Sequence, residues 1–120
     1  MSGDGRVGSE NCLFCRLVRK EIPATIVAES EECLAFRDVA PKAPVHVLVI
    51  PKAHVTSLND VSDFDLIGEL ARVATGVARE EGIAEGGYRL VVNTNADGGQ
   101  TVFHLHLHLL GGRHMAWPPG

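Results

Sequence analysis

Residues 104–110 alternate strictly between histidine and leucine and then close on a second leucine, His-Leu-His-Leu-His-Leu-Leu. In a β-strand successive side chains point to opposite faces, so this run predicts a strand with His104, His106 and His108 on one face. We expect the strand to extend over residues 101–110. Its leucine face must be buried in a core, and its histidine face is expected to be polar.

The spacing of this histidine row suits a small anion. At roughly 3.3 Å per residue, neighbouring imidazoles on one face lie about 6.6 Å apart, close enough to converge on a phosphate group. With an unperturbed pKa of about 6.5, one neutral imidazole can act as a nucleophile while its neighbours donate to phosphate oxygens. Two alternatives stay open: a solvent-facing strand with incidental histidines, and an all-histidine metal centre with an open position for water.

The segment Gly98-Gly99-Gln100-Thr101 directly precedes the row and favours the phosphate interpretation. Glycine lets backbone N–H groups approach an anion closely, and the Thr101 hydroxyl adds a donor. An ordinary hairpin turn explains the two glycines equally well.

The remaining apolar patterns predict two helices and four further strands. A short helix is expected over residues 12–19, because Pro23 bars its continuation. A long helix is expected to begin at a capping box of Ser62 and Asp65 and to end at Gly82. Short connections between strands favour an α+β domain with a five-stranded, mainly antiparallel sheet. The further strands are expected at residues 24–29, 33–38, 46–51 and 88–93.

Size and charge narrow the classes of function. A chain of 120 residues suffices for one compact core, so we expect a flexible arm over residues 1–11 and one domain over residues 12–120. A formal charge of −4 without a basic run argues against a nucleic acid polymer as partner. The polar N-terminus and the lack of a long apolar run argue against a membrane segment. Three cysteines fit a reducing compartment, and a cytoplasmic protein is expected.

Several segments beside the triad match a known family. They are Asn93 with the run 98–103 before the triad, the segments 19–23, 34–38 and 47–52, and the ending Trp-Pro-Pro-Gly at 117–120. With these residues the chain resembles the histidine triad (HIT) family, specifically its Hint branch of nucleoside phosphoramidases. The resemblance runs from about Cys12 to Gly120 and implies a HIT-like fold with a short N-terminal helix and one long helix.

The resemblance implies a covalent reaction on a nucleotide. His106 attacks the α-phosphorus of a purine nucleoside 5′-monophosphoramidate, the P–N bond breaks, and water hydrolyses the nucleotidyl-histidine. His108 and the backbone near Gly99 and Val102 hold the phosphate oxygens. Asn93, Thr101 and the third triad member, His104, complete the catalytic and phosphate-binding set. His46 matches a histidine in a proton relay behind the triad, although a histidine that opens a buried strand is more often structural.

The same resemblance implies how the nucleoside is held. Asp38 would accept the ribose hydroxyls, and its alternative role is a cap at the end of a strand. Arg37 stands where other Hint proteins carry a histidine beside the base, and a purine is still expected. A homodimer is implied, with the tail that carries Trp117 reaching toward the partner's site. The expected base slot consists of Leu13, Phe14, Leu17, Phe36 and Val39, which at these spacings are ordinarily core residues.

Cys12 and Cys15 are separated by two residues, the spacing with which two thiolates chelate one ion. Relatives add two imidazoles that correspond to His54 and His104, so a structural Cys2His2 zinc site is predicted, with no cofactor required for the chemistry. As a zinc ligand, His104 would have a scaffolding role and leave catalysis to the other two histidines. The alternative is a pair of buried, reduced thiols.

Two other functions stay open on sequence grounds. One is hydrolysis of dinucleoside polyphosphates, in which the leaving group is a nucleotide rather than an amine; the Trp-Pro-Pro-Gly ending favours the Hint branch over this activity. The other is a non-catalytic, nucleotide-binding or regulatory protein.

Overall fold

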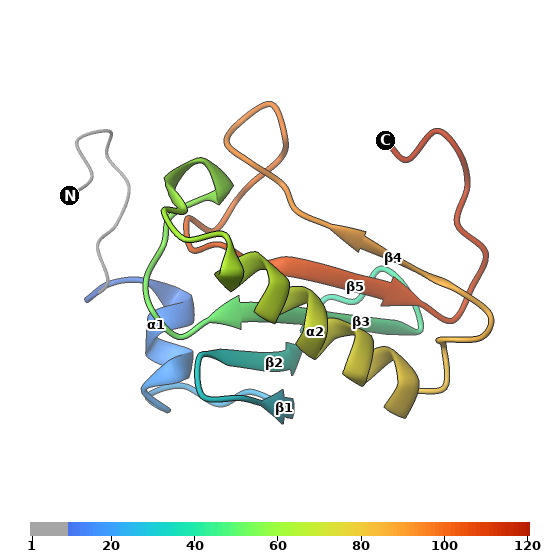
Figure 1. Ribbon diagram of the computed structural model, residues 1–120, viewed down its shortest axis with the longest axis horizontal. Coiled ribbons are helices and arrows are strands. Elements are labelled where there is room, and N and C mark those ends of the chain that lie inside the picture. The colour runs from blue at the N-terminus through green and yellow to red at the C-terminus, as the bar shows by residue number, and fades with distance from the viewer. Residues whose placement is uncertain (1–9) are drawn as a thin grey trace.

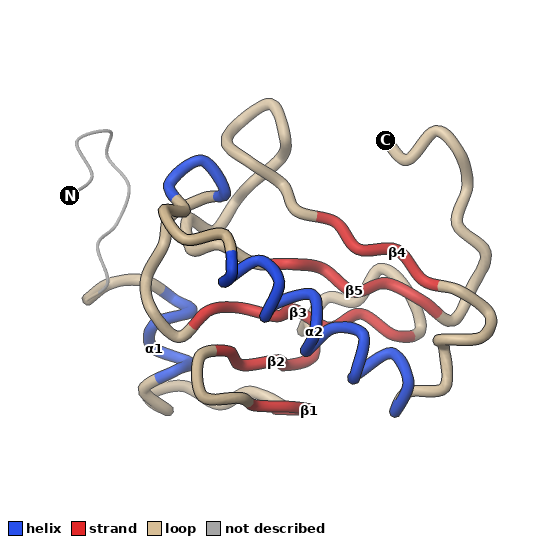
Figure 2. The backbone as a smooth tube through the Cα atoms, in the orientation of Figure 1, coloured by secondary structure: helices blue, strands red, loops and turns tan. Residues whose placement is uncertain are grey.

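The computed structural model describes residues 10–120, and most of the predicted arm, residues 1–9, lies outside the described residues. Two α-helices, one 3₁₀ helix and five strands are present in that part of the chain (Figures 1 and 2). In chain order they are α1 (Leu13–Val18), β1 (Ile26–Glu29), β2 (Cys33–Arg37), β3 (Val45–Pro51), η1 (Leu58–Asp60), α2 (Asp65–Glu80), β4 (Tyr88–Val91) and β5 (Leu107–Gly111).

The five strands form one sheet in the order β1-β2-β3-β5-β4, and every neighbouring pair is antiparallel. The predicted α+β class and five-stranded antiparallel sheet are confirmed. β3 is fully buried at the centre, and its pairing with β5 places Leu48 opposite His108 and His46 opposite Leu110. β4 and β1 are the two edge strands, and α2 crosses one face of the sheet (Figure 1).

The α2 side of the sheet holds the larger hydrophobic core. One face of α2 buries Leu70, Val73 and Val77, which pack in one cluster with apolar side chains of β2, β3 and β5. Leu105, Leu107 and Leu109 all belong to this cluster, so the predicted leucine face is confirmed. Burying each of these side chains contributes roughly 1.5–3 kcal/mol through removal of apolar surface from water.

The opposite face of the sheet is also covered, which differs from the polar face expected from the alternation. α1 packs there through Phe14 and Leu17, against Leu34, Phe36 and Leu48 of β2 and β3. His104 and His106 are 0% and 7% exposed. The histidine row therefore lies beneath a second, smaller core and not at an open surface.

The predicted last strand is too long, because β5 begins only at Leu107. The pairing of Val49 with Leu107 would, if continued, bring Leu105 opposite Pro51, and proline has no N–H to extend a ladder. The N–H of Leu105 donates instead to the carbonyl of Val55, at 2.6 Å.

The start of the long helix also differs from the prediction. Phe64 occupies the N-cap without a side-chain cap bond, and the Asp63 carboxylate accepts the N–H of Asp65. The capping box at Ser62 is therefore wrong. The preceding turn η1, absent from the sequence analysis, begins at Leu58, whose side chain packs against the larger core. At the other end Gly82 has a φ of +76°, a left-handed conformation that glycine adopts without strain.

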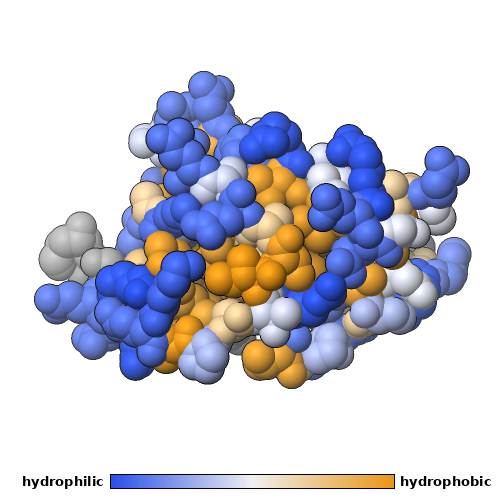
Figure 3. All heavy atoms as spheres, turned by 90° about the horizontal axis from the view of Figure 1, so that it is seen from below, coloured by the Kyte–Doolittle hydropathy of each residue, from blue (hydrophilic) through white to orange (hydrophobic). Residues whose placement is uncertain are grey.

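No helix within residues 10–120 is long and apolar enough to cross a membrane. Seen from the β1 side, the surface gathers apolar side chains in the middle and hydrophilic ones around them (Figure 3). Ile26 of β1 is 41% exposed, and Leu90 on the opposite edge is 36% exposed.

Candidate active site and metal cluster

A cavity of about 330 Å³ lies between α1, the end of β2 and the segment that leads into β5. It is lined by residues far apart in sequence, and both apolar and polar side chains take part. They are Leu13, Phe14, Leu17, Ile22, Pro23, Ala24, Phe36, Arg37, Asp38, Val39, Leu48, Thr101, Val102, His106 and His108.

All five residues of the predicted base slot line this cavity. Phe14, Leu17 and Phe36 are buried, and the rings of Phe14 and Phe36 meet edge to face with centroids 5.5 Å apart. These three side chains belong both to the slot and to the second core. Leu13 and Val39 are 46% and 97% exposed, which places them at the mouth of the cavity.

Asn93, Gly99 and Trp117 do not line the cavity in this single chain, and their predicted roles stay predictions. Trp117 is 81% exposed, with the guanidinium of Arg89 6.0 Å from its ring centroid. Gly99 lies in an exposed turn with a φ of +84°.

Residues that the sequence analysis did not assign also line the cavity: Ile22, Pro23, Ala24 and Leu48. The available signal was the Ile22-Pro23 pair a few residues after the end of α1 at Val18, which was interpreted as a helix stop and as part of the segment 19–23 that resembles the family. Arg37 contributes to the lining, but its guanidinium pairs with Glu81 at 2.8 Å. Because Glu81 is the C-cap of α2, the Arg37 side chain points to the face of the sheet opposite the base slot.

His106 is held in one tautomer by the backbone. Its Nδ1 lies 2.7 Å from the carbonyl oxygen of His104, so Nδ1–H donates and Nε2 keeps its lone pair. Burial lowers the pKa of His106, which keeps the ring neutral at neutral pH. Phe14 packs edge-on against it, with ring centroids 5.2 Å apart. A neutral imidazole with an available Nε2 in a cavity wall is suited to nucleophilic attack.

His46 and His108 form a directional pair. The N–H of Lys42 donates to Nδ1 of His46 at 3.0 Å, so the proton of this ring is on Nε2. That Nε2–H donates to Nδ1 of His108 at 3.0 Å, which places the proton of His108 on Nε2. Nε2 of His108 is buried and has no hydrogen-bond partner among the described residues. The Nε2–H of His108 is therefore available to donate a hydrogen bond to an anion in the cavity.

Desolvation dominates the electrostatics of this pair. Burial lowers the pKa of His108 to about 4 and lowers that of His46 as well, opposed in both cases by the charge of Asp38. Asp38 accepts the N–H of Ala40 at 2.8 Å, and its other oxygen lies 3.5 Å from Nε2 of His46. Asp38 thus caps the turn after β2 while it lines the cavity.

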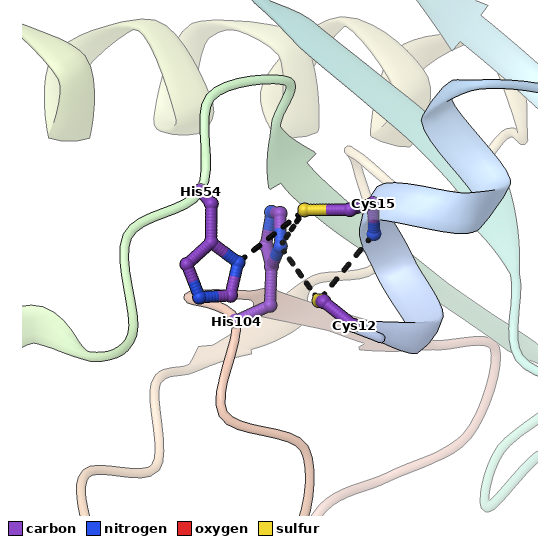
Figure 4. Close-up of side chains that lie close together, drawn as sticks. All are labelled: Cys12, Cys15, His54 and His104. Atoms are coloured by element: carbon purple, nitrogen blue, oxygen red, sulfur yellow. Dashed lines mark hydrogen bonds between the residues drawn. The ribbon is translucent and has the colours of Figure 1, made fainter. Parts of the chain in front are cut away.

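Cys12, Cys15, His54 and His104 come together from three separate segments (Figure 4). Each offers one ligand atom, and these atoms all lie within 4.8 Å of one another. Nδ1 of His104 is 3.2 Å from Sγ of Cys12 and 3.5 Å from Sγ of Cys15, and Nδ1 of His54 is 3.3 Å from Sγ of Cys15. In a tetrahedral zinc site the S···N separations are about 3.6 Å.

The chemistry of these donors fits a zinc ion. Nε2 of His104 donates to the carbonyl of Pro51 at 2.8 Å, which leaves Nδ1 unprotonated toward the thiols. Burial lowers the pKa of His104 to about 4 and that of His54 as well, so both rings offer lone pairs. Burial raises the pKa of Cys15 to about 11, so metal binding would have to release the thiol protons.

Gln100 is a further residue that the sequence analysis did not single out. Its side chain is 6% exposed, and its amide nitrogen donates to the carbonyls of Thr56 and Val102 at 2.7 and 3.1 Å. Its amide oxygen accepts the N–H of Asn95 at 2.9 Å. Gln100 therefore ties the turn before the triad to the loop that follows His54.

Comparison with known proteins gives consistent matches. The HIT domain family model matches residues 19–115. The chain is 48% identical over 107 residues to the purine nucleoside phosphoramidase of Escherichia coli (strain K12), covering 88% of this chain and 90% of that protein. It matches a crystal structure of a HIT family hydrolase from Legionella pneumophila at a TM-score of 0.88 and 55% identity, covering 92% of this chain and 100% of the other.

A second solved structure bears on the metal cluster. It is a Zn-bound histidine triad family protein from Mycobacterium smegmatis, with a TM-score of 0.79 and 34% identity. The match covers 88% of this chain and 78% of that protein.

Proposed function

Because this chain belongs to the HIT domain family, we propose that it is a nucleotide-binding hydrolase that cleaves the P–N bond of purine nucleoside 5′-monophosphoramidates. The name of the Escherichia coli relative supports both the bond and the purine. The observation that carries the proposal is the tautomer of His106, whose Nδ1–H is held by a carbonyl while Nε2 is available in the wall of a nucleotide-sized cavity.

The proposed chemistry has two steps. Nε2 of His106 forms a bond to the α-phosphorus as the P–N bond to the amine breaks, and the leaving amine takes up a proton from water, which is made good by the proton released when water attacks in the second step. Water then attacks the phosphorus, the bond to His106 breaks, and a nucleoside monophosphate is released. Neutrality of His106 supports this role, because burial lowers its pKa and keeps a lone pair available at neutral pH.

The other polar groups of the cavity stabilise the negative charge of the phosphate and position the substrate. Nε2–H of His108 donates to a non-bridging phosphate oxygen, and the bond from His46 keeps the His108 proton on that nitrogen. Thr101 and Asp38 lie on the same lining, where Asp38 accepts the ribose hydroxyls. We propose that Asn93 and the backbone at Gly99 and Val102 donate further hydrogen bonds to the phosphate when it enters the cavity.

Zinc and a second copy of the chain belong to the same proposal. Cys12, Cys15, His54 and His104 would hold zinc in a structural role, outside the chemical steps. In a two-fold dimer the tail with its exposed Trp117 would reach the partner's cavity.

The test is release of amine and nucleoside monophosphate from an aminoacyl or alkyl adenosine phosphoramidate and its guanosine counterpart. We expect His106→Ala to lower kcat/KM by about 10⁴-fold or more, because the nucleophile is lost. His114→Ala is the matched control, since His114 is exposed and outside the cavity lining. Undiminished turnover by His106→Ala, or hydrolysis of a dinucleoside polyphosphate but of no phosphoramidate, would contradict the proposal.

A further inference from the structure

The turn after β5 is packed against the loop between β2 and β3. Nε and Nη2 of Arg113 both donate to the carbonyl oxygen of Lys42, at 3.3 and 3.0 Å. Gly112, directly before, has a φ of +91°, and a Cβ at this position would lie 2.9 Å from Cβ of Pro44. Only glycine satisfies both the conformation and the close approach, so this contact is specific.

Lys42 links that contact to the candidate active site through its own backbone. Its carbonyl accepts from Arg113, and its N–H donates to Nδ1 of His46 at 3.0 Å. The loop is stiff here, since Pro41 fixes one torsion before Lys42 and Pro44 restricts the residue before itself. The N–H and the carbonyl of Lys42 are related by the φ and ψ of Lys42 itself, and the bonds to His46 and from Arg113 hold one group each. Loss of the bond from Arg113 would leave Lys42 held at its N–H alone, with its ψ released.

The Lys42 N–H determines where two imidazole protons lie. While it donates to Nδ1 of His46, the His46 proton is on Nε2 and points at Nδ1 of His108, 3.0 Å away. If the N–H moves off, His46 can carry its proton on Nδ1 and accept at Nε2. His108 would then place its own proton on Nδ1, and its Nε2 would have none to donate to a phosphate oxygen.

We propose that Arg113 is a positioning residue for this site: it holds the Lys42 carbonyl, and through His46 it keeps His108 in the tautomer that donates from Nε2. The inference rests on the proposed phosphoramidase function for its kinetic consequence. Its structural consequence, the tautomer of His46, can be measured without turnover.

The experiment compares Arg113→Met, Arg113→Lys and Arg72→Met. Methionine retains an aliphatic chain and removes the donors. Arg72 is the matched control because its guanidinium also makes two hydrogen bonds, to Glu69 of the same helix α2 at 2.8 and 2.6 Å, on the face of the sheet opposite the cavity. Ring-nitrogen shifts of His46 and His108 are measured by heteronuclear NMR at neutral pH, together with kcat and KM for an adenosine phosphoramidate.

We expect Arg113→Met to mix the two His46 tautomers and to lower kcat about tenfold, with KM within about twofold of the unmodified protein. Arg113→Lys should restore part of the tautomer preference and part of kcat, and Arg72→Met should change neither. Unmixed tautomers in Arg113→Met, or the same change in Arg72→Met, would overturn the inference. If the unmodified protein hydrolyses no phosphoramidate, the proposed function fails, and the NMR comparison still decides the role of Arg113.

Discussion

The three histidines of the triad are evenly spaced in sequence but differ in which ring nitrogen carries the proton. One hydrogen bond decides the tautomer of each ring: His104 donates to Pro51 from Nε2, His106 donates to a carbonyl from Nδ1, and His108 accepts at Nδ1 from His46. The ring of His104 faces the thiols, while its carbonyl holds His106. Equal spacing in sequence thus produces three unequal chemical groups.

Acid should destabilise the fold through the hydrogen-bonded pair of His108 and His46. Burial lowers the pKa of His108 to about 4 and also lowers that of His46, so between the folded and unfolded pKa values the unfolded chain binds more protons. For His108 this contribution to stability is complete above about pH 6.5 and is lost as the pH falls toward about 4, and His46 changes it in the same direction. We expect the free energy of unfolding to fall by up to about 1.4 kcal/mol per pH unit through His108, with a further decrease from His46, measured by urea denaturation below about pH 6.5.

The matched variant is the double substitution His46→Gln and His108→Gln. It should make the acid limb of the stability curve less steep, because glutamine does not titrate; the limb that remains comes from other buried histidines, His104 among them. An acid limb of unchanged steepness would assign the effect to other groups.

At the residue scale, the sequence predicts which side chains form the cavity wall better than it predicts the path of the turn before the triad. Phe14 and Phe36 lie on regular elements whose periodicity determines their direction, and both line the cavity. Gly99 lies in a turn whose path depends on the buried Gln100, which bonds to Thr56 more than forty residues away. No local pattern encodes such a tertiary bond. The position of His46 on a buried strand was predictable, but the Lys42 bond that determines its tautomer was not.

At the element scale, the same limit appears at the ends of strands and helices. The alternation from 104 to 110 predicts a strand with two faces; the strand is present only from Leu107, while Leu105, Leu107 and Leu109 do share one core. The length of β5 depends on its partner, because Pro51 ends the ladder on β3. The start of α2 depends on Asp63 rather than on the Ser62 box. Periodicity identifies an element, whereas the start of β5 is determined by a partner strand and the start of α2 by which of two adjacent polar side chains accepts the first free N–H groups.

Helix α1 carries both the proposed zinc thiols and part of the cavity wall, so we expect metal binding to influence nucleotide binding. Its N-cap is Cys12, and Cys15 follows Phe14 of the cavity. We expect removal of zinc to raise the Kd for a purine nucleoside monophosphate and to speed hydrogen exchange of the α1 amides. At a zinc concentration of about 100 times its Kd, the ion should add about 3 kcal/mol to the free energy of unfolding.

Calorimetry of zinc-loaded and chelator-treated protein measures this effect. Cys12→Ala should behave like the stripped protein, while Cys33→Ala, a buried cysteine outside the metal cluster, should respond to zinc like the unmodified chain. Less than about a tenth of an equivalent of zinc in protein with full nucleotide affinity would contradict the prediction.

Helix α2 offers a stability test that does not involve the cavity. Gly68 lies inside the helix with an ordinary φ and open space around a Cβ position, whereas Gly82 after its end has a φ of +76°. We expect Gly68→Ala to raise the free energy of unfolding by about 0.5–1 kcal/mol and Gly82→Ala to lower it by about 1 kcal/mol. Thermal unfolding of the two variants side by side checks the signs, and two shifts of the same sign would refute the assignment.

For the whole molecule, the unpaired strand edges predict how two copies associate. β4 and β1 both end the sheet, with Leu90 and Ile26 exposed to a similar degree, 36% and 41%. The exposed Trp117 tail lies near β4, where Arg89 of that strand donates to Ala116. We therefore expect a dimer that uses the β4 side, and Leu90→Lys should shift it toward monomer by placing a charge at the interface.

Sedimentation velocity at micromolar concentration distinguishes the outcomes. The unmodified protein and the matched control Ile26→Lys should sediment at twice the 12.9 kDa chain mass. A monomeric unmodified protein, or dissociation by Ile26→Lys but not by Leu90→Lys, would refute the assignment to β4.

One face of the sheet packs against α2, and the other face borders the cavity. The larger core lies between the sheet and α2, and none of the described residues of that core lines the cavity on the other side. A laboratory that evolves this protein can therefore divide its libraries: substitutions facing α2 tune heat tolerance, and substitutions around α1 and the end of β2 tune substrate choice. Because the two sets share no side chain, gains selected in one should survive transfer into the other.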